Sequence, residues 1–391
     1  MHIALFLHSL STGGAQRRSI MLANGLAARG HRVDLVTAVG GGPQAGLVAN
    51  NVNPVALAPG SARDVAAGGA RAGELLSAIR PLCTYLRDRH PAMLVAMANH
   101  AVLPAVMAHG LAAKGGTRLV LRASNHLSRQ RTGGPSLRRL AESWLWRRAD
   151  GILAVSDDVA RDAARLTGLG ADRIISVPSP ILPDGIALPR RSVCPDGLPA
   201  EILAMGRFVR QKGFDTLLRG FALLLSRRPA HLTLAGDGPD GEALKALCRE
   251  LGIRQHVSFP GLVSNPFQRM AAADLFVLSS RWEGMPGVLV EAMATGCPAI
   301  STDCPGGSRE LLRHGALGPL VPVDDPAALA EGMDAALSHP VAETVLRDRI
   351  RGFTVAGATA AYEQALLSMG GQTPTAAGTG RLTRPAIGGA D

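Results

Sequence analysis

The chain has 391 residues, of which 47% are hydrophobic and 18% are charged. This length exceeds one ordinary core and predicts two domains of roughly 150–200 residues each, and the composition is that of a globular protein. A membrane-spanning helix needs about 20 consecutive apolar residues, and no such run occurs. The first residues, MHIALFLHSL, lack the basic region and the cleavage site of a signal peptide.

The net charge of +10 is unevenly distributed along the chain. Residues 1–190 contain 22 Lys and Arg against 11 Asp and Glu, whereas residues 191–391 contain 19 against 20. The excess positive charge is densest from Lys114 to Arg148. This asymmetry is typical of a domain that meets an anionic membrane, a phosphorylated acceptor or nucleic acid. An arginine-rich solvated face is the alternative interpretation.

The chain contains five cysteines and no C-x-x-C motif. This pattern argues against a disulfide framework and against a zinc site. We expect Cys297 and Cys304 to be buried thiols, and we expect a cytoplasmic location.

Short apolar runs alternate with helical patterns, which is typical of parallel sheets built from βαβ units. A helix after the first strand ends at Gly30, and a second α/β pattern starts near residue 201. Six prolines from Pro178 to Pro199 predict a linker between the two patterns, because proline removes backbone donors and disfavours a preceding helix. The predicted strands are 2–10, 31–39, 92–97, 117–124, 151–156, 173–178, 201–207, 231–238, 256–261, 274–280 and 298–302.

These patterns predict an α/β protein with two Rossmann-like, doubly wound domains that face each other across a cleft, since ligands bind such sheets at the carboxyl ends of the strands. One domain would lie at 1–180, and we expect the last helix of the chain to pack back on it. The other segments are a proline-rich linker at 181–200, a second domain at 201–368 and a disordered tail at 369–391.

Two loops carry groups that suit an anionic ligand. The turn STGG places Gly14 at a helix N-terminus, where backbone N–H groups are free for anions. Its pattern is not G-x-G-x-x-G, and a plain tight turn is equally consistent with it. Arg207 and Lys212 follow the strand EILAMG, and such groups bind phosphate oxygens. Two basic residues on a loop are more often simply solvated.

Glu283 and Glu291 stand eight positions apart in RWEGMPGVLVEAM, around a helix start at Pro286. A fully helical connection would separate them by about 12 Å along the axis. A retaining glycosidase pair needs about 5–5.5 Å and an inverting pair about 6.5–9.5 Å. The spacing therefore does not favour an acid/base couple. It favours an anion site at the helix start with carboxylates placed to accept hydroxyl groups, or two ordinary structural glutamates.

The chain resembles family 4 of the retaining, nucleotide-sugar-dependent glycosyltransferases, which have the GT-B fold. The stretches that carry the resemblance are STGGAQRRSIMLANGLAARGHRVDLVT, GRFVRQKGFDTLL, LAGDGP, VSFPGLVSNP, AAADLFVLSSRWEGMPGVLVEAMATGCPAISTDCPGGSRELL and GPLVPVDDPAALAE. The stretch EGMPGVLVE matches the family's E-x7-E motif, and it is preceded by GR-x4-KG.

The resemblance implies that the domain at 1–180 lies on the acceptor side and that the domain at 201–368 binds the nucleotide sugar. It also implies a role for each matched position. Arg207 and Lys212 would clamp the donor diphosphate, Glu283 would contact the transferred sugar, and Glu291 would hold the ribose hydroxyls. Gly14 would approach the diphosphate or the acceptor from the other domain. Backbone N–H groups of the segment around the helix start would contact sugar and phosphate, and the segment consists of Gly284, Met285, Pro286, Gly287 and Val288. Pro286 belongs to the segment but has no N–H to donate.

The resemblance also implies a polar catalytic residue after the strand TRLVLRAS. Arg122, Ser124, Asn125 and His126 compete for that position, and we select His126. No Asp-x-Asp motif occurs, so neither a metal nor another cofactor is expected besides the UDP-sugar donor.

The segment from Leu137 to Trp146 reads as a helix that carries Leu140, Trp144 and Leu145. Its rim is basic and consists of Arg138, Arg139, Arg147 and Arg148. It suits peripheral contact with an anionic membrane, and a helix packed on its domain with a solvated arginine face is equally consistent. The segment lacks a recognisable nucleic-acid-binding motif, so a nucleic-acid partner is not expected.

The function implied is transfer of a hexose or N-acetylhexosamine from a UDP-sugar to a sugar or lipid-linked hydroxyl acceptor, with retention of anomeric configuration. Synthesis of cell-surface polysaccharide or glycolipid, at the cytoplasmic side of the membrane, is the expected setting. A nucleotide-sugar 2-epimerase of the same fold class and a non-catalytic sugar-nucleotide-binding protein are the alternatives.

Overall fold

The structure of the chain is a computed structural model that describes residues 1–58, 68–112, 116–128, 137–189, 191 and 198–371. The chain divides into two compact units, which are described separately. Unit 1 comprises Met1–Pro180 and Thr354–Asp391, and unit 2 comprises Ile181–Phe353.

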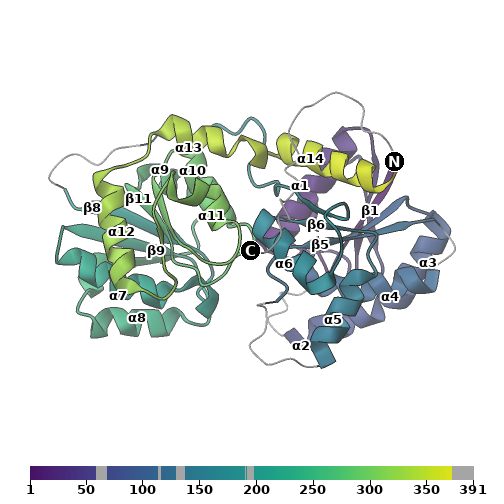
Figure 1. Cartoon of the computed structure of the whole chain (residues 1–391), viewed down its shortest axis with the longest axis horizontal. Coiled ribbons are helices and arrows are strands. Elements are labelled where there is room, and N and C mark those ends of the chain that lie inside the picture. The colour runs from purple at the N-terminus through teal and green to yellow at the C-terminus, as the bar shows by residue number, and fades with distance from the viewer. Residues whose placement is uncertain (59–67, 113–115, 129–136, 190, 192–197, 372–391) are drawn as a thin grey trace. The chain divides into compact units, whose positions relative to one another are not determined.

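Unit 1 contains a parallel sheet of seven strands in the order β3-β2-β1-β4-β5-β6-β7 (Figure 1). Helices cover both faces of such a sheet, and its strands are therefore almost continuously apolar. Strand β1 pairs with both β2 and β4, and its residues Ile3 to Leu7 are all buried. The strands are β1 (His2–Leu7), β2 (Arg32–Thr37), β3 (Val52–Ala56), β4 (Met93–Ala96), β5 (Arg118–Ala123), β6 (Gly151–Ala154) and β7 (Ile174–Ser176).

The helices of unit 1 lie on the two faces of its sheet. Crossovers between parallel strands are right-handed. The crossover from β1 to β2 moves toward one edge of the sheet, and the crossover from β4 to β5 moves toward the other edge. Their helices therefore lie on opposite faces of the sheet. The helices are α1 (Gly14–Ala28), α2 (Gly68–Ser77), α3 (Ile79–Arg89), α4 (Val102–Ala112), α5 (Leu137–Arg147), α6 (Asp157–Thr167) and α14 (Val355–Met369), with short 3₁₀ turns at Ala45–Leu47 and Asn99–Ala101.

Helix α14 belongs to unit 1 and packs against α1. Glu363 accepts hydrogen bonds from Arg29 and His31, at 2.7 and 2.6 Å, and the hydroxyl of Tyr362 accepts one from the buried Arg122 at 2.6 Å. These contacts tie the last helix to the first domain. The helix reaches Met369, and residues 372–391 of the predicted disordered tail lie outside the described residues.

Unit 2 contains a parallel sheet of six strands in the order β10-β9-β8-β11-β12-β13. Its strands are β8 (Ala200–Met205), β9 (Ala230–Ala235), β10 (Val257–Gly261), β11 (Leu275–Leu278), β12 (Ala299–Thr302) and β13 (Leu320–Val321). Its helices are α7 (Phe214–Leu225), α8 (Gly241–Glu250), α9 (Pro266–Ala272), α10 (Gly287–Ala294), α11 (Ser308–Leu311), α12 (Pro326–Ser338) and α13 (Glu343–Arg349), with 3₁₀ turns at Arg210–Lys212, Arg254–His256, Arg313–Gly315 and Arg351–Phe353.

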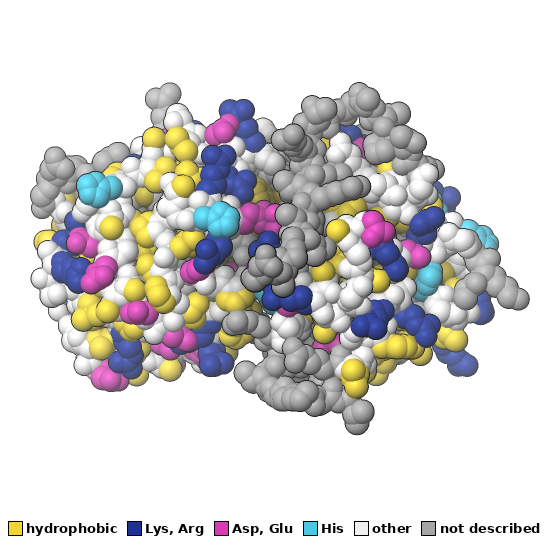
Figure 2. Space-filling model, in the orientation of Figure 1, with side chains coloured by type: hydrophobic (Ala, Val, Ile, Leu, Met, Phe, Trp, Pro, Cys, Tyr) yellow, Lys and Arg dark blue, Asp and Glu magenta, His cyan; other side chains and the backbone are white. Residues whose placement is uncertain are grey.

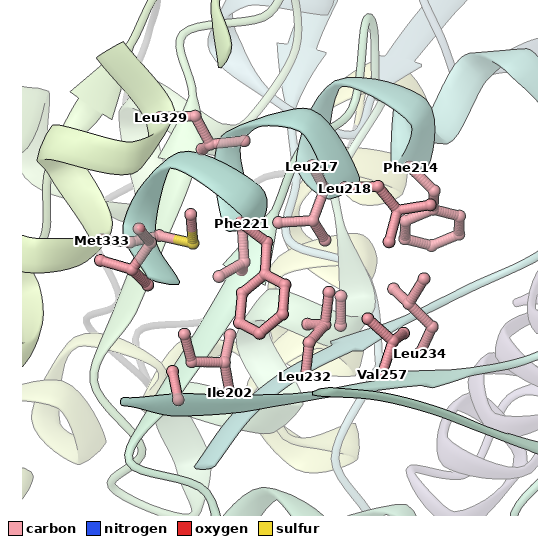
Figure 3. Close-up of a cluster of buried hydrophobic side chains, with 14 of the residues drawn as sticks. Ile202, Phe214, Leu217, Leu218, Phe221, Leu232, Leu234, Val257, Leu329 and Met333 are labelled. Carbon is pink, nitrogen blue, oxygen red and sulfur yellow. The ribbon is translucent and has the colours of Figure 1, made fainter. Parts of the chain in front are cut away.

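The core of unit 2 lies between α7 and the sheet (Figure 3). The buried residues Phe214, Leu217, Leu218 and Phe221 recur at helical spacing, so α7 turns one apolar face onto the strands. The strands contribute Ile202, Leu232, Leu234 and Val257, and α12 contributes Leu329 and Met333.

The structure adds two strands that the sequence analysis did not predict. The edge strand β3 contains Asn53 and Pro54, which weaken a strand signal, and β13 has only two residues. The predicted linker starts as ordered chain, because Ile181 and Leu182 are buried and both donate backbone hydrogen bonds to the carbonyl of Phe353. Residues 190 and 192–197 of that linker lie outside the described residues.

Candidate functional site

The strand order of unit 2 changes direction beside β8. The chain runs from β8 to β9 and β10 on one side, and then returns to place β11 and β12 on the other. Ligands of doubly wound sheets bind at the carboxyl ends of the strands at such a switch point. The loop after β8 carries Arg207 and Lys212, and the loop after β11 carries Glu283. Three predicted site residues therefore lie at the switch point.

Lys212 and Glu283 form an ion pair at this point. The Nζ of Lys212 lies 2.6 Å from Oε1 of Glu283, and the same oxygen accepts a hydrogen bond of 2.7 Å from the hydroxyl of Ser280. The carboxylate is 6% exposed and Ser280 is fully buried. Both described partners use Oε1, so Oε2 keeps its acceptor capacity, and the ammonium keeps two of its three N–H donors.

Further bonds join the two loops behind this pair. The guanidinium of Arg281 donates to both carboxylate oxygens of Asp215, at 3.0 and 2.8 Å, and to the carbonyl of Arg210 at 2.7 Å. The backbone N–H of Arg281 donates to the carbonyl of Gln211, whose side chain donates to the carbonyl of Trp282. Burial raises the pKa of Asp215, but the hydrogen bonds and charge of Arg281 outweigh it and hold that pKa below its usual value.

Two glycines permit the close approach of these loops. Gly213, at φ +61°, would place a Cβ 2.1 Å from the carbonyl oxygen of Ser279, and Gly306, at φ +126°, would place one 2.3 Å from the carbonyl oxygen of Glu283. A side chain at either position would force the backbone apart, and both conformations disfavour residues other than glycine.

Helix α10 begins directly after the Glu283 loop, at Gly287. Its N-cap residue is Pro286, whose side chain makes no capping hydrogen bond. Pro286 and Gly287 are both buried. The first N–H groups of a helix have no partner within the helix, and its dipole favours an anion there. Gly284 and Met285 are also buried, whereas Val288 and Glu291 are partly exposed one turn apart on α10. Gly296, at φ +77°, follows the end of this helix.

The remaining groups on this edge are more exposed. Arg207 is exposed on the loop after β8. A hollow of about 560 Å³ lies beyond the end of β10 and is lined by Pro260, Leu262, Val263, Ser264, Asn265, Gln268, Arg269 and Ala272. Because only β9 separates β10 from β8, this hollow is about 10 Å along the sheet from the switch point.

The two cysteines of this region are buried thiols, as predicted. Cys297 is fully buried and Cys304 is 3% exposed. Burial and the negative charge of Glu283 raise the pKa of Cys304 to about 11, so the thiol is protonated and unreactive at neutral pH.

In unit 1, Gly14 opens helix α1 at the carboxyl end of β1, where the strand order of that sheet changes direction between β1 and β4. Gly14 is exposed, and a Cβ there would meet nothing within 4 Å. The first turn of α1 has no acidic residue and no side-chain cap. The position is therefore open to an approaching anion.

His126 is 5% exposed and lies between two carboxylates of α6. Its Nε2 is 2.6 Å from Asp158 and its Nδ1 is 3.5 Å from Asp162. Burial alone would lower the pKa of His126, but the hydrogen bonds and charges of Asp158 and Asp162 raise it to about 9. Both ring nitrogens are thus engaged within unit 1. This geometry favours an imidazolium that fixes the loop after β5, and it argues against a group that exchanges protons with a substrate.

Arg122, a competitor for the same position, is buried and donates to Tyr362, Ser179 and the carbonyl of Met97. Within the described residues, no group of three or more His, Cys, Asp or Glu is arranged to hold a metal ion. Sequence reasoning missed Ser280, Arg281 and Asp215, because a serine, an arginine and an aspartate on separate loops carry no motif of their own.

Two family models match the chain. Residues 12–184 match "Glycosyltransferase Family 4" and residues 199–339 match "Glycosyl transferases group 1". The first match covers most of unit 1 and the second covers the sheet and site of unit 2.

Curated relatives are similar over part of their length. The chain is 34% identical over 190 residues to the lipopolysaccharide core biosynthesis glycosyltransferase LpsE of Rhizobium meliloti, which is 48% of this chain and 54% of LpsE. It is 33% identical over 136 residues to the N-acetylgalactosamine-N,N'-diacetylbacillosaminyl-diphospho-undecaprenol 4-alpha-N-acetylgalactosaminyltransferase of Campylobacter jejuni, 35% of this chain and 37% of that protein. The aligned part thus spans about half, or less, of these relatives.

Solved structures share the whole architecture. Anabaena Alr3699/HepE in complex with UDP matches with a TM-score of 0.73 and 20% identity, and covers 94% of this chain and 100% of that one. At this identity the likeness establishes the fold alone. The chain has the GT-B fold, as the sequence predicted. The two family matches and the relatives support a GT-B glycosyltransferase and do not favour the epimerase.

Proposed function

We propose that the chain is a retaining glycosyltransferase that moves a hexose or N-acetylhexosamine from a UDP-sugar to a hydroxyl acceptor. The observation that carries this proposal is the Lys212–Glu283 pair at the switch point of unit 2, beside the uncapped start of α10. This arrangement occurs in a chain whose two halves each match a glycosyltransferase family model.

The donor diphosphate lies against Lys212, Arg207 and the start of α10. Lys212 has two N–H donors left for phosphate oxygens, and Arg207 is exposed and can fork onto two of them. The N–H groups near Gly287 and Val288 add fixed dipoles. Each charged hydrogen bond contributes about 1.5–3 kcal/mol. The same groups stabilise the negative charge that grows on the departing diphosphate.

The two glutamates hold hydroxyl groups. Glu283 accepts from the transferred sugar through Oε2, while Lys212 and Ser280 fix its other oxygen. Glu291, partly exposed on α10, accepts from the ribose hydroxyls. The hollow beyond β10 offers room for the rest of an extended donor along the same edge.

In the reaction, the acceptor oxygen attacks the anomeric carbon from the side on which the bond to the diphosphate oxygen breaks. The proton of the acceptor hydroxyl passes to that departing oxygen, and UDP leaves. Retention follows from attack on the same face. This route requires no carboxylate couple at glycosidase spacing, and Glu283 is committed to Lys212 instead.

The remaining assignments follow the same proposal. Gly14 approaches the diphosphate or the acceptor from unit 1, whose placement across a cleft from unit 2 stays a prediction. The catalytic role assigned to His126 also stays a prediction. The engagement of its ring by two carboxylates argues against that role. The names of LpsE and of the Campylobacter enzyme point to a sugar acceptor in a cell-surface glycan or on a lipid diphosphate. UDP as the donor nucleotide is supported by its presence in the HepE structure.

The proposal is tested by incubating the protein with a panel of UDP-sugars and GDP-sugars and separating the products by mass spectrometry. Release of UDP that rises when a lipid-linked or oligosaccharide acceptor is added supports the transferase. An isomerised sugar nucleotide would identify an epimerase, and binding without turnover would identify a non-catalytic protein.

A further inference from the structure

Helix α4 of unit 1 is apolar on the side that faces solvent. Its sequence, VLPAVMAHGLA, has one polar side chain, His109, which bonds to the carbonyl of Thr117. Val102, Pro104, Ala105, Val106 and Ala108 are buried, whereas Leu103, Met107 and Leu111 are 40, 40 and 55% exposed. A helix that is apolar all round normally has both sides covered. No described residue of unit 1 covers the exposed stripe of α4, which lies at positions i, i+4 and i+8.

Helix α5 continues this surface. Leu140 is 70% exposed and Trp144, one turn later, is 49% exposed, whereas Trp146 is buried. The guanidinium carbon of Arg148 lies 4.1 Å from the centroid of the Trp144 ring. An aromatic ring capped by an arginine is amphipathic, with an apolar body and a cationic tip.

The two stripes face the same way. The crossovers from β4 to β5 and from β5 to β6 are both right-handed and run in the same direction, so α4 and α5 lie on one face of the sheet. The two helices contact each other, and α3 packs on the other side of α4. Their outer sides therefore form one surface. Figure 2 shows hydrophobic and Lys or Arg side chains next to one another over the region that α4 and α5 occupy in Figure 1.

The rim of this surface is basic. Arg80 and Arg87 of α3 and Arg147 and Arg148 at the end of α5 are exposed. Arg87 also bonds to the carbonyl of Leu111, which holds its guanidinium at the end of the α4 stripe. The acidic side chains described on the same helices are Asp88 and Glu142. The surface thus combines an apolar centre with an excess of arginine.

We propose that the outer sides of α4 and α5 form a membrane-contact surface, which places Leu103, Met107, Leu111, Leu140 and Trp144 at the headgroup boundary of an anionic bilayer. Apolar side chains enter that boundary and arginines pair with lipid phosphates, each of them contributing about 1 kcal/mol near an anionic surface. The charge decides against a second copy of the chain, because an isologous contact would bring the arginine rims together. None of the described helices is long and apolar enough to cross a bilayer, so the contact is peripheral.

This inference is independent of the donor site, since no residue of unit 2 takes part. The test is co-sedimentation of the full chain with vesicles of phosphatidylcholine alone and of phosphatidylcholine with phosphatidylglycerol, at low and high salt. The test variant is Leu103→Ser/Met107→Ser/Leu111→Ser, and the matched control is Leu223→Ser/Leu262→Ser, which changes exposed leucines of unit 2. All five positions are exposed, so both variants are expected to fold.

We expect the wild type and the control to bind the anionic vesicles and to be released by salt. The test variant loses about tenfold or more of its binding, because partly exposed leucine and methionine side chains no longer enter the lipid. The substitution Arg147→Gln weakens binding about fivefold. The fluorescence of Trp144 shifts to shorter wavelength on vesicles, and this shift is absent in Trp144→Phe.

Three results would overturn the proposal. The first is absence of binding to anionic vesicles at low salt. The second is binding that the test variant and the control retain equally. The third is a wild-type dimer in solution that the test variant abolishes, which would assign the surface to a second copy.

Discussion

The Nζ of Lys212 lies 2.6 Å from Oε1 of Glu283, although 71 positions separate the two residues in the chain. The contact joins the loop after β8 to the loop after β11, which are neighbours because the sheet order reverses between them. It fixes one oxygen of the carboxylate and leaves lysine N–H donors for a phosphate.

Replacing Lys212 by alanine removes the cation from the diphosphate and leaves Glu283 buried without its charged partner. We expect kcat/KM to fall at least about 100-fold, the usual scale for losing a preorganised transition-state donor. Steady-state UDP release measures it. Lys245→Ala is the control, because Lys245 is partly exposed on α8, where it pairs with Glu242. Near-normal turnover in Lys212→Ala would remove the diphosphate role.

Replacing Glu291 by alanine removes an acceptor for the ribose hydroxyls. We expect the Kd for UDP to rise about tenfold, which corresponds to the loss of one charged hydrogen bond. Isothermal titration calorimetry with UDP is the measurement. Glu331→Ala serves as the control, because that carboxylate is exposed and its pair with Arg227 is long, at 3.5 Å. Equal affinity in the Glu291 variant and the wild type would refute the assignment.

We expect Arg281 to act as a positioning residue through the loop of Lys212. Arg281→Gln removes the bidentate hydrogen bonds to Asp215 and the ion pair with Asp324. We expect the free energy of unfolding to fall by about 1–3 kcal/mol and the KM for the donor to rise more than kcat falls, since the site loosens without losing a reacting group. Arg227→Gln, at an exposed ion pair, should change stability by less than about 1 kcal/mol. A stability loss with unchanged KM would leave Arg281 a purely structural role.

Gly306→Ala tests the close approach behind Glu283. The new methyl would lie 2.3 Å from the carbonyl oxygen of Glu283, at a φ of +126°. We expect both lower stability and weaker donor binding, because the loop that carries the carboxylate must move. Gly315→Ala is the matched control, since Gly315 also has a positive φ but a Cβ there meets nothing within 4 Å. Equal UDP affinities in the two variants would contradict the prediction.

His126 predicts a pH dependence of stability. Its pKa is about 9 in the folded chain against 6.5 for an ordinary histidine. A raised pKa gives stability that is fully present below pH 6.5 and is lost as the pH rises through 9. The contribution is on the order of 3 kcal/mol. The measurement is denaturant unfolding at several pH values. The free energy of unfolding of the wild type should decline from pH 6.5 to 9, and this decline should be shallower in His126→Gln. Parallel declines would show that His126 is not the group responsible.

Much of the architecture could be predicted from the sequence, for identifiable reasons. Strands buried on both faces, such as β1 and β11, are continuous apolar runs with glycine-rich turns, so their positions are readable. The short edge strands β3 and β13 have no such signal. Gly30 marked the end of α1, because a residue after a helix with positive φ is usually glycine.

The sequence predicted members of a candidate site, but it did not predict the contacts between them. The chain order places Lys212 and Glu283 on separate loops, and only the strand order β9-β8-β11 shows that they touch. The supporting Arg281–Asp215 pair could not be found for the same reason. His126 was selected as a polar residue after a strand, whereas its engagement by Asp158 and Asp162 depends on how α6 packs against that loop.

Retaining transfer from a UDP-sugar is tested most directly by following the reaction with ¹H NMR, using the preferred UDP-sugar and an acceptor. We expect UDP release coupled to a new glycosidic bond, whose anomeric proton shows the same configuration as the donor. We also expect loss of this signal in Lys212→Ala but not in Lys245→Ala. An inverted anomeric product, or transfer that Lys212→Ala leaves unchanged, would contradict the proposed function.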